Sequence, residues 1–502
     1  MPKTEKLQTP KARIPRGFRD CLGPQVAAER EMLARICKAY EAWGFDALET
    51  PALEYTDALG KFLPDIDRPN DGVFSLKDDD DQWLSLRYDL TAPLARYVAE
   101  NYESLSKPFR RYAVGAVWRN EKPGPGRFRQ FTQCDADTVG APAPYADAEC
   151  CAMLSEAIEA AGIPANEFVI RINDRNALAG LLETIELSGE ELAGQRLKIF
   201  RAMDKLDRLG EAGVRLLLGP GRKDESGDFT EGAKLKDPDI ERVVAFMKAT
   251  GDTNGATCAR LADVVGGSKA GAKGVETLAA IARELSRSGF DERRIRIDLS
   301  VIRGLEYYTG PVFEAELRAA FMADDGKLVR FGSIASGGRY DDLVSRFKGT
   351  EIPAVGVSIG VSRLLAALTR MNRGEDAAAG PIVVIAFDRE HMADYQQMAA
   401  ELRAAGFRAE VYVGGAGMKA QMKYADRRRA PLAIIQGGDE RARGEVIVKD
   451  LILGAEISSQ IAGHDEWKDM RAAQIAVPRE RLAEEVLRVM ARLHAPKAES
   501  TS

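Results

Sequence analysis

Alternating polar and apolar residues between positions 109 and 139 predict an antiparallel hairpin. Its two arms flank the segment Glu121-Lys122-Pro123-Gly124-Pro125-Gly126, whose prolines and glycines favour a stiff turn over a helix or strand. Because successive side chains of a strand point to opposite faces, the second arm presents one polar face, made of Arg129, Phe131, Gln133, Asp135 and Asp137. Such a face suits a ligand with an anionic part and a flat part; a solvated sheet face is the alternative.

Helical spacing of apolar residues predicts a helix from Pro24 to Trp43, ending before Gly44. A strand over 46–50 follows and ends at Pro51, which suits a strand end or edge. Further on, Asp78-Asp79-Asp80-Asp81 is expected at a solvated hairpin tip, with a cation site as the alternative. A second helix is expected to begin within residues 87–93 and to run to about Tyr102.

Residues 174–292 are rich in leucine and alanine at helical spacing, which predicts a mainly helical insertion. Strand-like segments resume at 294–299, 310–317, 328–331 and 354–359, and a helix from Val361 to Thr369 follows. Because these strands follow one another without helical connections, we expect a mostly antiparallel sheet flanked by helices. This α+β unit comprises residues 14–173 and 293–372.

Residues 373–380 form an expected linker, after which strand and helix patterns alternate over residues 381–495. The expected elements are strands at 382–387, 409–413 and 432–436, helices ending near Gly406 and Arg429, a hairpin at 437–440, and a final helix to Leu493. The pattern predicts a small α/β domain with a mixed, largely parallel sheet. The fold class of the whole chain is therefore α/β.

Composition narrows the class of protein. The chain has 502 residues, enough for about three folding units, and a formal net charge of -6, which argues against indiscriminate nucleic-acid binding and against a DNA-binding role. Its six cysteines form no Cys-x-x-Cys pair, which favours free thiols in a reducing compartment. No apolar run approaches the ~18 residues that span a membrane, so we expect no membrane association.

The basic, proline-containing N-terminus has no apolar core, so we expect no secretory signal and a cytoplasmic location, with a mitochondrial presequence as the alternative. The three histidines, His391, His464 and His494, lie in the last quarter of the chain and next to no motif. Histidine-based acid–base catalysis is therefore not expected.

Three glycine-containing segments carry the strongest chemical signals. Residues 301–310 (VIRGLEYYTG) combine an arginine, a carboxylate and two tyrosines in an expected loop, and Arg303 can fork onto phosphate or carboxylate oxygens. Residues 335–341 (ASGGRYD) are expected to form a loop whose paired glycines allow a ligand to approach the backbone. Residues 356–363 (GVSIGVSR) run from a strand into a helix and place Arg363 in the first helical turn, where anions bind.

In order and spacing, these segments and the hairpin resemble the histidyl-tRNA synthetase family, which belongs to the class II aminoacyl-tRNA synthetases, from about Ile14 to Leu493. The resemblance implies an ATP-dependent histidine–tRNA ligase, which forms histidyl-adenylate and diphosphate and then transfers histidine to the 3′ end of tRNA(His), releasing AMP. It implies Mg²⁺ bound with ATP, through ligands that the sequence does not identify, and a homodimer formed through the first helix and the Pro51-ended strand. Residues 381–495 would be the anticodon-binding domain, and residues 14–173 with 293–372 the catalytic domain.

The resemblance also implies roles for matching residues. Arg119 and Arg303 are expected to be catalytic, at the α-phosphate. ATP is expected to contact Arg119, Glu121, Phe131 and Arg363. Histidine is expected to contact Asp89, Thr91, Gln133, Asp137, Arg303, Tyr307, Tyr308 and Tyr340. These roles fit the chemistry, because joining a carboxylate to a phosphate requires positioning and fixed positive charge more than a general base.

Two departures from the family pattern concern charged residues. Ser362 stands before Arg363 where members of the family usually carry Glu, which leaves open how Arg363 is oriented. The segment Pro123-Gly124-Pro125-Gly126 lacks polar side chains, so Lys122, Arg127 and Arg129 are the candidate contacts to the tRNA acceptor end. In the last domain, Lys423 and Arg427, within the cluster Lys419, Lys423, Arg427, Arg428 and Arg429, are candidates for RNA contact; a solvated helix face is the alternative.

Two other functions fit parts of the pattern. A synthetase-like regulatory subunit would bind histidine without charging tRNA, but such proteins usually lose the phosphate-clamping arginines or the last domain, and both are present here. A class II synthetase for another amino acid is opposed by the segments around Arg303 and Gly337-Gly338. ATP–diphosphate exchange with each amino acid in turn discriminates among the three.

Overall fold

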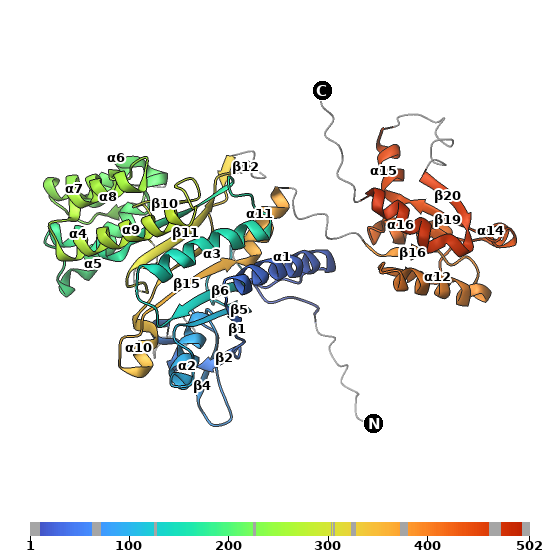
Figure 1. The fold of residues 1–502 in the computed structure, drawn as a ribbon, viewed down its shortest axis with the longest axis horizontal. Coiled ribbons are helices and arrows are strands. Elements are labelled where there is room, and N and C mark those ends of the chain that lie inside the picture. Colours follow the sequence, from blue (N-terminus) through green and yellow to red (C-terminus); the bar gives the residue numbers. More distant parts are fainter. Residues whose placement is uncertain are drawn as a thin grey trace, which may run out of the picture. The chain divides into compact units, whose positions relative to one another are not determined.

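The computed structural model describes residues 11–62, 72–124, 128–223, 227–302, 304, 307–322, 328–371, 380–460 and 473–493. The chain divides into two compact units, residues 1–375 and 376–502 (Figure 1). Each unit has a hydrophobic core of its own.

The first unit is built on an eight-stranded sheet in the described residues, with strand order β1-β5-β6-β15-β14-β11-β7-β10. The strands span Asp46–Ala47, Phe109–Trp118, Gln130–Val139, Ala354–Gly360, Ser333–Arg339, Pro311–Leu317, Phe168–Asp174 and Ile295–Ile297, in that order. The five inner pairings are antiparallel, and the two edge pairings, β1 with β5 and β7 with β10, are parallel. The prediction of a mostly antiparallel sheet is confirmed.

Helices cover one face of this sheet, and the other face is polar. The covering helices are α1 (Gly23–Ala42), α3 (Tyr145–Ala161), α9 (Lys269–Arg287) and α11 (Val361–Arg370) (Figure 1). On β6, Cys134 and Ala136 are fully buried within the hydrophobic core that these helices share. The intervening residues Gln133, Asp135 and Asp137 therefore point to the opposite, polar face, as the alternation in the sequence predicts.

Smaller elements border the polar face. Strands β2 (Leu53–Tyr55), β3 (Ser75–Lys77) and β4 (Trp83–Leu86) form a separate three-stranded sheet, and Asp78–Asp81 form the predicted tip between β3 and β4. The 3-10 helix η1 (Thr56–Phe62) and the helices α2 (Thr91–Asn101) and α10 (Asp342–Lys348) complete this side.

Between β7 and β10 the chain is mainly helical, as predicted. It forms α4 (Arg175–Thr184), η2 (Glu190–Leu192), α5 (Ala193–Met203), α6 (Leu206–Leu218), the hairpin β8 (Gly221–Lys223) and β9 (Phe229–Glu231), α7 (Asp237–Lys248), α8 (Asn254–Val265) and α9. These helices are the green part of Figure 1. Helices α4 and α9 meet almost backbone to backbone, because a Cβ built on Gly180 would lie 2.3 Å from Gly271 Cα.

The paired glycines Gly337 and Gly338 lie in strand β14 and not in the loop that the sequence analysis expected. A Cβ on Gly337 would lie 2.2 Å from the carbonyl oxygen of Gly356 on β15, and a Cβ on Gly338 would lie 2.8 Å from the ring of Tyr308. The two glycines therefore let a neighbouring strand and a tyrosine ring approach the backbone. The close approach of other parts of the chain, and not only that of a ligand, therefore explains why both positions are glycine.

The second unit contains a five-stranded sheet in the described residues, with order β17-β16-β18-β19-β20. The strands span Ala409–Val411, Ile382–Val384, Leu432–Ile435, Glu445–Asp450 and Gln474–Pro478. The sheet is mixed, as predicted, but parallel pairing is limited to β16 with β17 and β18. "Largely parallel" overstated it, because the sequence analysis did not identify the antiparallel strands β19 and β20.

Helices α12 (Met392–Ala404), α13 (Met418–Arg427), α15 (Leu451–Gln460) and α16 (Leu482–Leu493) surround this sheet. The hairpin expected at 437–440 is wrong, since these residues begin the short helix α14 (Gly438–Ala442). A carboxylate oxygen of Glu440 accepts a hydrogen bond from Gly437 N (2.9 Å), which satisfies a free donor at the start of that helix. Across the described residues, no helix is long and apolar enough to cross a bilayer.

Candidate active site

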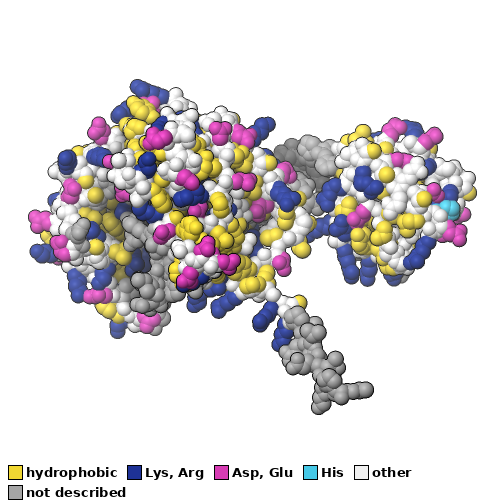
Figure 2. All heavy atoms as spheres, turned by 90° about the horizontal axis from the view of Figure 1, so that it is seen from below, with side chains coloured by type: hydrophobic (Ala, Val, Ile, Leu, Met, Phe, Trp, Pro, Cys, Tyr) yellow, Lys and Arg dark blue, Asp and Glu magenta, His cyan; other side chains and the backbone are white. Residues whose placement is uncertain are grey.

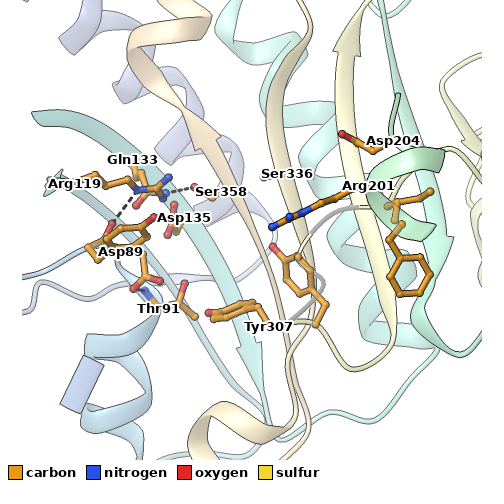
Figure 3. Close-up of a pocket in the computed structure, with 15 residues that line it drawn as sticks. Asp89, Thr91, Arg119, Gln133, Asp135, Arg201, Asp204, Tyr307, Ser336 and Ser358 are labelled. Carbon is orange, nitrogen blue, oxygen red and sulfur yellow. Dashed lines mark hydrogen bonds between the residues drawn. The ribbon is translucent and has the colours of Figure 1, made fainter. Parts of the chain in front are cut away.

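Two adjoining cavities open on the polar face of the eight-stranded sheet. The larger has a volume of about 600 Å³ and the smaller about 410 Å³. Four residues line both: Arg119, Gln133, Ser336 and Ser358. Figure 3 shows these side chains converging from neighbouring strands onto the larger cavity.

Arg119 follows the last residue of β5 and is held between two aromatic rings. Its guanidinium carbon lies 4.3 Å from the ring centre of Tyr88 and 5.1 Å from that of Phe131. These contacts fix the side chain without neutralising its charge. A permanent cation is thereby placed where the two cavities meet.

Arg363 lies in the first turn of α11 and lines the smaller cavity. Its Nη2 donates a hydrogen bond to the carbonyl oxygen of Phe331 (2.9 Å), and its guanidinium carbon lies 5.9 Å from the Phe331 ring centre. Phe331 therefore contributes to the orientation of the guanidinium that follows Ser362.

The predicted ATP residues Glu121 and Phe131 line the smaller cavity together with Arg119 and Arg363. A carboxylate oxygen of Glu121 accepts a hydrogen bond from the Tyr88 hydroxyl (3.1 Å). Lys122 and Arg129 line the same cavity, and Arg129 Nε donates to the carbonyl oxygen of Glu121 (3.0 Å). Arg127 lies outside the described residues.

On the other side of Arg119, the larger cavity is rich in carboxylates and tyrosines. Asp89 precedes α2, and its Oδ1 accepts hydrogen bonds from the backbone N–H groups of Thr91 (3.2 Å) and Ala92 (2.9 Å). Burial raises the pKa of Asp89, and these hydrogen bonds partly oppose that rise. Tyr307 and Tyr308 line the cavity with their rings edge to face, 5.1 Å between centres.

Asp137 and Tyr340 lie beneath this cavity. Asp137 Oδ2 is 2.9 Å from Arg111 Nη2, and its Oδ1 accepts a hydrogen bond from the Tyr340 hydroxyl. Burial raises the pKa of Asp137, against the opposing effect of Arg111. Neither Asp137 nor Tyr340 is among the lining residues of the cavities. The structure therefore brings both next to the other residues that are predicted to bind histidine, but behind the wall of the cavity.

The predicted catalytic residue Arg303 lies outside the described residues. Its described neighbours Ile302 and Gly304 line the larger cavity, as do Tyr307 and Tyr308 from the same segment. The segment that carries Arg303 therefore borders the cavity, and the role of Arg303 itself stays a prediction.

Sequence reasoning missed several lining residues. Asp135 and Ser358 face each other on β6 and β15, and Ser336 pairs with Ser358 on β14. The alternation along β6 had placed Asp135 on the right face, but the family resemblance assigned it no role. The helical insertion supplies Phe200, Arg201 and Asp204, and Figure 3 shows Arg201 extending from its helix toward the cavity. No local signal in the sequence connects the insertion to this site.

Asp135 is 2% exposed, and its carboxyl group has an unusual environment. Burial raises the pKa of Asp135 to about 7, with a further contribution from the nearby charge of Asp137. Arg111 and the hydroxyl of Ser358 act in the opposite direction. At neutral pH this carboxyl group is therefore divided between its protonated and ionised forms.

The described residues contain no cluster of three or more His, Cys, Asp or Glu side chains suited to a metal. Mg²⁺ in nucleotide sites is held mainly by phosphate oxygens and water, with one or two carboxylates. Glu121 is the carboxylate among the lining residues of the smaller cavity. This donor set fits a Mg²⁺ ion that arrives with ATP.

The basic residues predicted to contact RNA lie on or directly after α13 in the second unit. Lys419, Lys423 and Arg427 are exposed and recur every four residues, so they share one side of the helix. Arg428 is engaged by Glu410, with Nε and Nη2 at 3.0 and 3.1 Å from its carboxylate oxygens. Figure 2 shows Lys and Arg side chains gathered along one edge of the second unit.

Comparison with known proteins agrees with this geometry. Residues 17–364 match the family model described as histidyl-tRNA synthetase, and residues 381–488 match that described as an anticodon binding domain. A Brucella ovis protein named histidine–tRNA ligase is 54% identical over 489 residues, which cover 97% of each chain. The crystal structure of histidyl-tRNA synthetase from Nostoc sp. PCC 7120 aligns with a TM-score of 0.72 and 29% identity, over 96% of this chain and 100% of that one.

A Bacillus halodurans structure described as an ATP phosphoribosyltransferase regulatory subunit/histidyl-tRNA synthetase aligns with a TM-score of 0.63 over 83% of this chain and 97% of that one. At 23% sequence identity, this similarity shows a shared fold and nothing more. The match over residues 17–364 and the 54% identity over nearly the whole length decide the family. The chain belongs to the histidyl-tRNA synthetase family.

Proposed function

We propose that the chain activates histidine with ATP and then transfers it to tRNA(His). The observation that carries this proposal is the position of Arg119, which lines both a cavity with further arginines and a cavity with carboxylates and tyrosines. The phosphates of ATP suit the cavity with arginines, and the ammonium and ring N–H groups of histidine suit the cavity with carboxylates. The carboxylate of histidine and the α-phosphate of ATP would then meet at Arg119.

In the first step, a carboxylate oxygen of histidine attacks the α-phosphorus of ATP. The bond from that phosphorus to the bridging oxygen of the β-phosphate breaks, and diphosphate leaves with the electron pair. Arg119 and Arg303 stabilise the negative charge that develops on the α-phosphoryl oxygens, and Arg363 holds the γ-phosphate. Glu121 and Phe131 receive the adenine ring, which stacks on Phe131.

The larger cavity holds histidine. Asp89, Thr91 and Gln133 bind its backbone groups, and Tyr307, Tyr308 and Tyr340 with Asp137 enclose the imidazole. In the second step, a ribose hydroxyl at the 3′ end of tRNA attacks the aminoacyl carbonyl carbon, and AMP leaves. Both steps depend on positioning and charge, which is consistent with the position of His391 in the second unit, outside these cavities.

Mg²⁺ supplies charge neutralisation of the phosphates when it is bound with ATP. Because Glu121 is assigned to the adenine ring, phosphate oxygens and water would supply most of the ligands of the ion. We therefore assign Mg²⁺ as the metal and ATP as its main ligand.

Two surfaces serve tRNA(His). Lys122 and Arg129 line the ATP cavity, and these two residues, together with Arg127, are assigned to the acceptor end. Lys423 and Arg427 on α13 are assigned to phosphates of the anticodon arm. Reversing both charges on α13 (Lys423→Glu with Arg427→Glu) is expected to leave histidine-dependent ATP–diphosphate exchange unchanged and to reduce charging several-fold, with a weaker salt dependence. Equal charging by this variant and the wild type would contradict the assignment of Lys423 and Arg427 to the anticodon arm.

We further propose a homodimer and a cytoplasmic location. Large apolar side chains are exposed beside the first helix and the strands that follow it, including Leu22 (77% exposed) and Tyr55 (56%), as expected of a surface that pairs with another subunit. All six cysteines are free, which fits a reducing compartment.

The regulatory-subunit alternative is less supported, because Arg119 and Arg363 line the same cavity and the second unit is present. ATP–diphosphate exchange with each of the twenty amino acids tests the proposed function. Exchange that requires histidine is the expected result. Histidine binding without exchange would favour the regulatory subunit, and exchange with another amino acid would reassign the substrate. Arg303→Ala is expected to abolish most exchange while circular dichroism shows an intact fold.

A further inference from the structure

The N-terminal strap, residues 15–20 (PRGFRD), lies against the turn between β5 and β6 and lines neither of the two cavities. The backbone carbonyl oxygen of Gly17 accepts a hydrogen bond from the backbone N–H of Arg129 (2.8 Å). The carbonyl oxygen of Arg129 in turn accepts a hydrogen bond from the backbone N–H of Arg119 (2.9 Å). Two successive backbone hydrogen bonds therefore connect the strap to the arginine at which the cavities meet.

Side chains of the strap add contacts to the same turn. The guanidinium carbon of Arg19 lies 4.2 Å from the ring centre of Phe128, a cation–π contact. Phe18 lies next to Phe74, with 6.0 Å between the ring centres. The guanidinium carbon of Arg129 lies 5.9 Å from the ring centre of Phe74, so that ring contacts both the strap and the turn.

Gly17 allows the strap and the turn to approach each other closely. Its φ is +86°, a left-handed conformation that residues with a side chain rarely adopt. A Cβ built on Gly17 would lie 2.9 Å from Cγ of Arg129 and 3.2 Å from Cβ of Pro123. A methyl group at position 17 would therefore displace either the strap or the turn.

The residues that the strap contacts belong to one of the two cavities. Pro123, Phe128 and Arg129 line the smaller cavity and not the larger one. Arg129 Nε also donates a hydrogen bond to the carbonyl oxygen of Glu121 (3.0 Å), which lines the same cavity. The strap thus contacts the groups that face ATP without facing ATP itself.

We propose that the N-terminal strap positions the turn between β5 and β6 for ATP binding, with Gly17 and Arg19 as positioning residues; this inference rests on the proposed function. A turn at the end of a hairpin has few buried contacts of its own and opens easily. Without the strap, the turn would be in its ATP-binding position for a smaller fraction of the time. The apparent affinity for ATP falls by that fraction, and the affinity for histidine does not.

The first test is Gly17→Ala. The KM for ATP in ATP–diphosphate exchange is expected to rise about 10- to 100-fold, because the displaced turn misplaces the groups around the nucleotide. The KM for histidine is expected to stay within about twofold. Equal increases in both KM values would show that the strap only stabilises the fold, and would overturn the proposal.

The matched control is Gly289→Ala. Gly289 has the same φ of +86° and lines neither cavity, and no described atom lies within 4 Å of the Cβ that alanine would add. The backbone strain is therefore the same in both variants, and only the contact with the turn differs. Equal KM values for ATP in Gly17→Ala and Gly289→Ala would contradict the proposal.

The second test concerns the cation–π contact. Arg19→Ala is expected to raise the KM for ATP about two- to fivefold, and Arg19→Lys, which keeps a cation, is expected to raise it less. In a Phe128→Leu background, Arg19→Ala should have no further effect, because its partner ring is already gone. Fully additive effects of the two substitutions would show that Arg19 does not act through Phe128, and would remove Arg19 from the proposal.

The third test uses the wild type alone and applies even where Gly17→Ala fails to fold. If the strap favours ATP binding, then bound nucleotide must favour the docked strap by the same factor. Adenylyl imidodiphosphate, a non-hydrolysable ATP analogue, is therefore expected to slow amide hydrogen exchange in residues 15–20 as well as in the turn. Equal hydrogen exchange of residues 15–20 with and without the analogue would overturn the proposal.

Failure of the proposed function has a different signature. The wild type would then show no histidine-dependent ATP–diphosphate exchange at all. Failure of this inference alone leaves that reaction intact and removes only the difference between Gly17→Ala and Gly289→Ala.

Discussion

The two cavities that meet at Arg119 handle charge in opposite ways. In the smaller cavity, Arg119 lies between two aromatic rings, and Arg363 donates a hydrogen bond to the carbonyl oxygen of Phe331, so contacts with the protein orient both guanidinium groups. In the larger cavity, Asp135 is buried and Asp89 is half-buried, and desolvation raises the pKa values of both carboxyl groups. One cavity thus presents permanent charge, and the other presents carboxyl groups whose charge depends on pH.

The difference follows from the chemistry of the side chains. A guanidinium stays protonated in proteins, so it needs orientation and no electrostatic partner. A buried carboxyl group whose desolvation outweighs the effect of nearby cations takes up a proton more readily. The arginine side therefore suits the joining of two anionic groups, and the carboxylate side suits the positive group of an amino acid.

Removing Arg119, the cation that lines both cavities, is expected to have the largest effect on the exchange reaction. Arg119→Ala should reduce kcat/KM for histidine-dependent ATP–diphosphate exchange by about 10²-fold or more, because the transition-state charge loses its partner. The matched control is Arg293→Ala, since the side chain of Arg293 is 90% exposed and lines neither cavity. Comparable rates in the two variants would mean that Arg119 does not serve the reaction.

Removing the second cation should affect one cavity only. Arg363→Ala is expected to raise the KM for ATP about 10- to 100-fold and to leave the Kd for histidine, measured without ATP, within about twofold. Calorimetry with each ligand separately checks both values. A matching loss of histidine affinity would show that the two cavities do not act independently.

The cavity with carboxyl groups should make the protein sensitive to pH. Lowering the pH is expected to weaken histidine binding and to increase the free energy of unfolding. Because the pKa of Asp135 is about 7, lowering the pH from 8 to 6 is expected to weaken histidine binding about tenfold, as the carboxyl group becomes protonated. Triazolylalanine, whose ring is not protonated in this range, separates this effect from titration of the ligand. A pH-independent Kd for that analogue would show that the ionisation of Asp135 does not affect histidine binding.

The free energy of unfolding should change the other way. Asp135 and Asp174 have pKa values of about 7 in the folded protein and about 3.8 as reference, so the folded state binds more protons between these values. Stability is therefore expected to fall as the pH rises through this window, by roughly 1 kcal/mol for each pH unit and group. Asp174→Asn should flatten this pH dependence, as measured by urea unfolding at pH 6 and pH 8.

The smallest expected effect concerns the cation that the insertion adds to the carboxylate-rich cavity. Arg201→Ala is expected to reduce exchange only a few-fold, because Arg201 is exposed and Arg119 remains. Single-turnover transfer to tRNA should fall further than exchange does. An effect as large as that of Arg119→Ala would make Arg201 part of the charge-stabilising group and would blur the distinction between the cavities.

Much of the fold follows from local patterns in the sequence. The alternation along β6 indicates the face that carries Gln133 and Asp135, and helical spacing predicts α1 and α11. Strands β19 and β20 could not be predicted in the same way, because their pairing is between segments separated by residues 451–473, and short strands are defined by their partners. The assignment of Gly337 and Gly338 to a loop failed for a related reason, since the neighbours that require them lie on β15 and at Tyr308.

The residues of the candidate site could likewise be predicted only in part from the sequence. Residues within motifs, such as Arg119, Glu121 and Arg363, could be grouped from the family resemblance, and the structure places them around one cavity. The ion pair of Asp137 with Arg111, by contrast, depends on the arrangement of neighbouring strands, which the sequence does not specify. The contribution of Arg201 depends on how the insertion folds back, which no spacing in the sequence encodes.

The contact of α4 and α9 at Gly180 and Gly271 has a consequence for how this protein can change over evolution. Helices α5 to α8 lie between these two helices in the chain, and α9 returns the chain to β10 beside β7. Insertions and deletions between α4 and α9 leave the sheet register untouched as long as these two helices persist. Lineages can therefore remodel the part that carries Arg201 while the chemistry beneath it stays fixed.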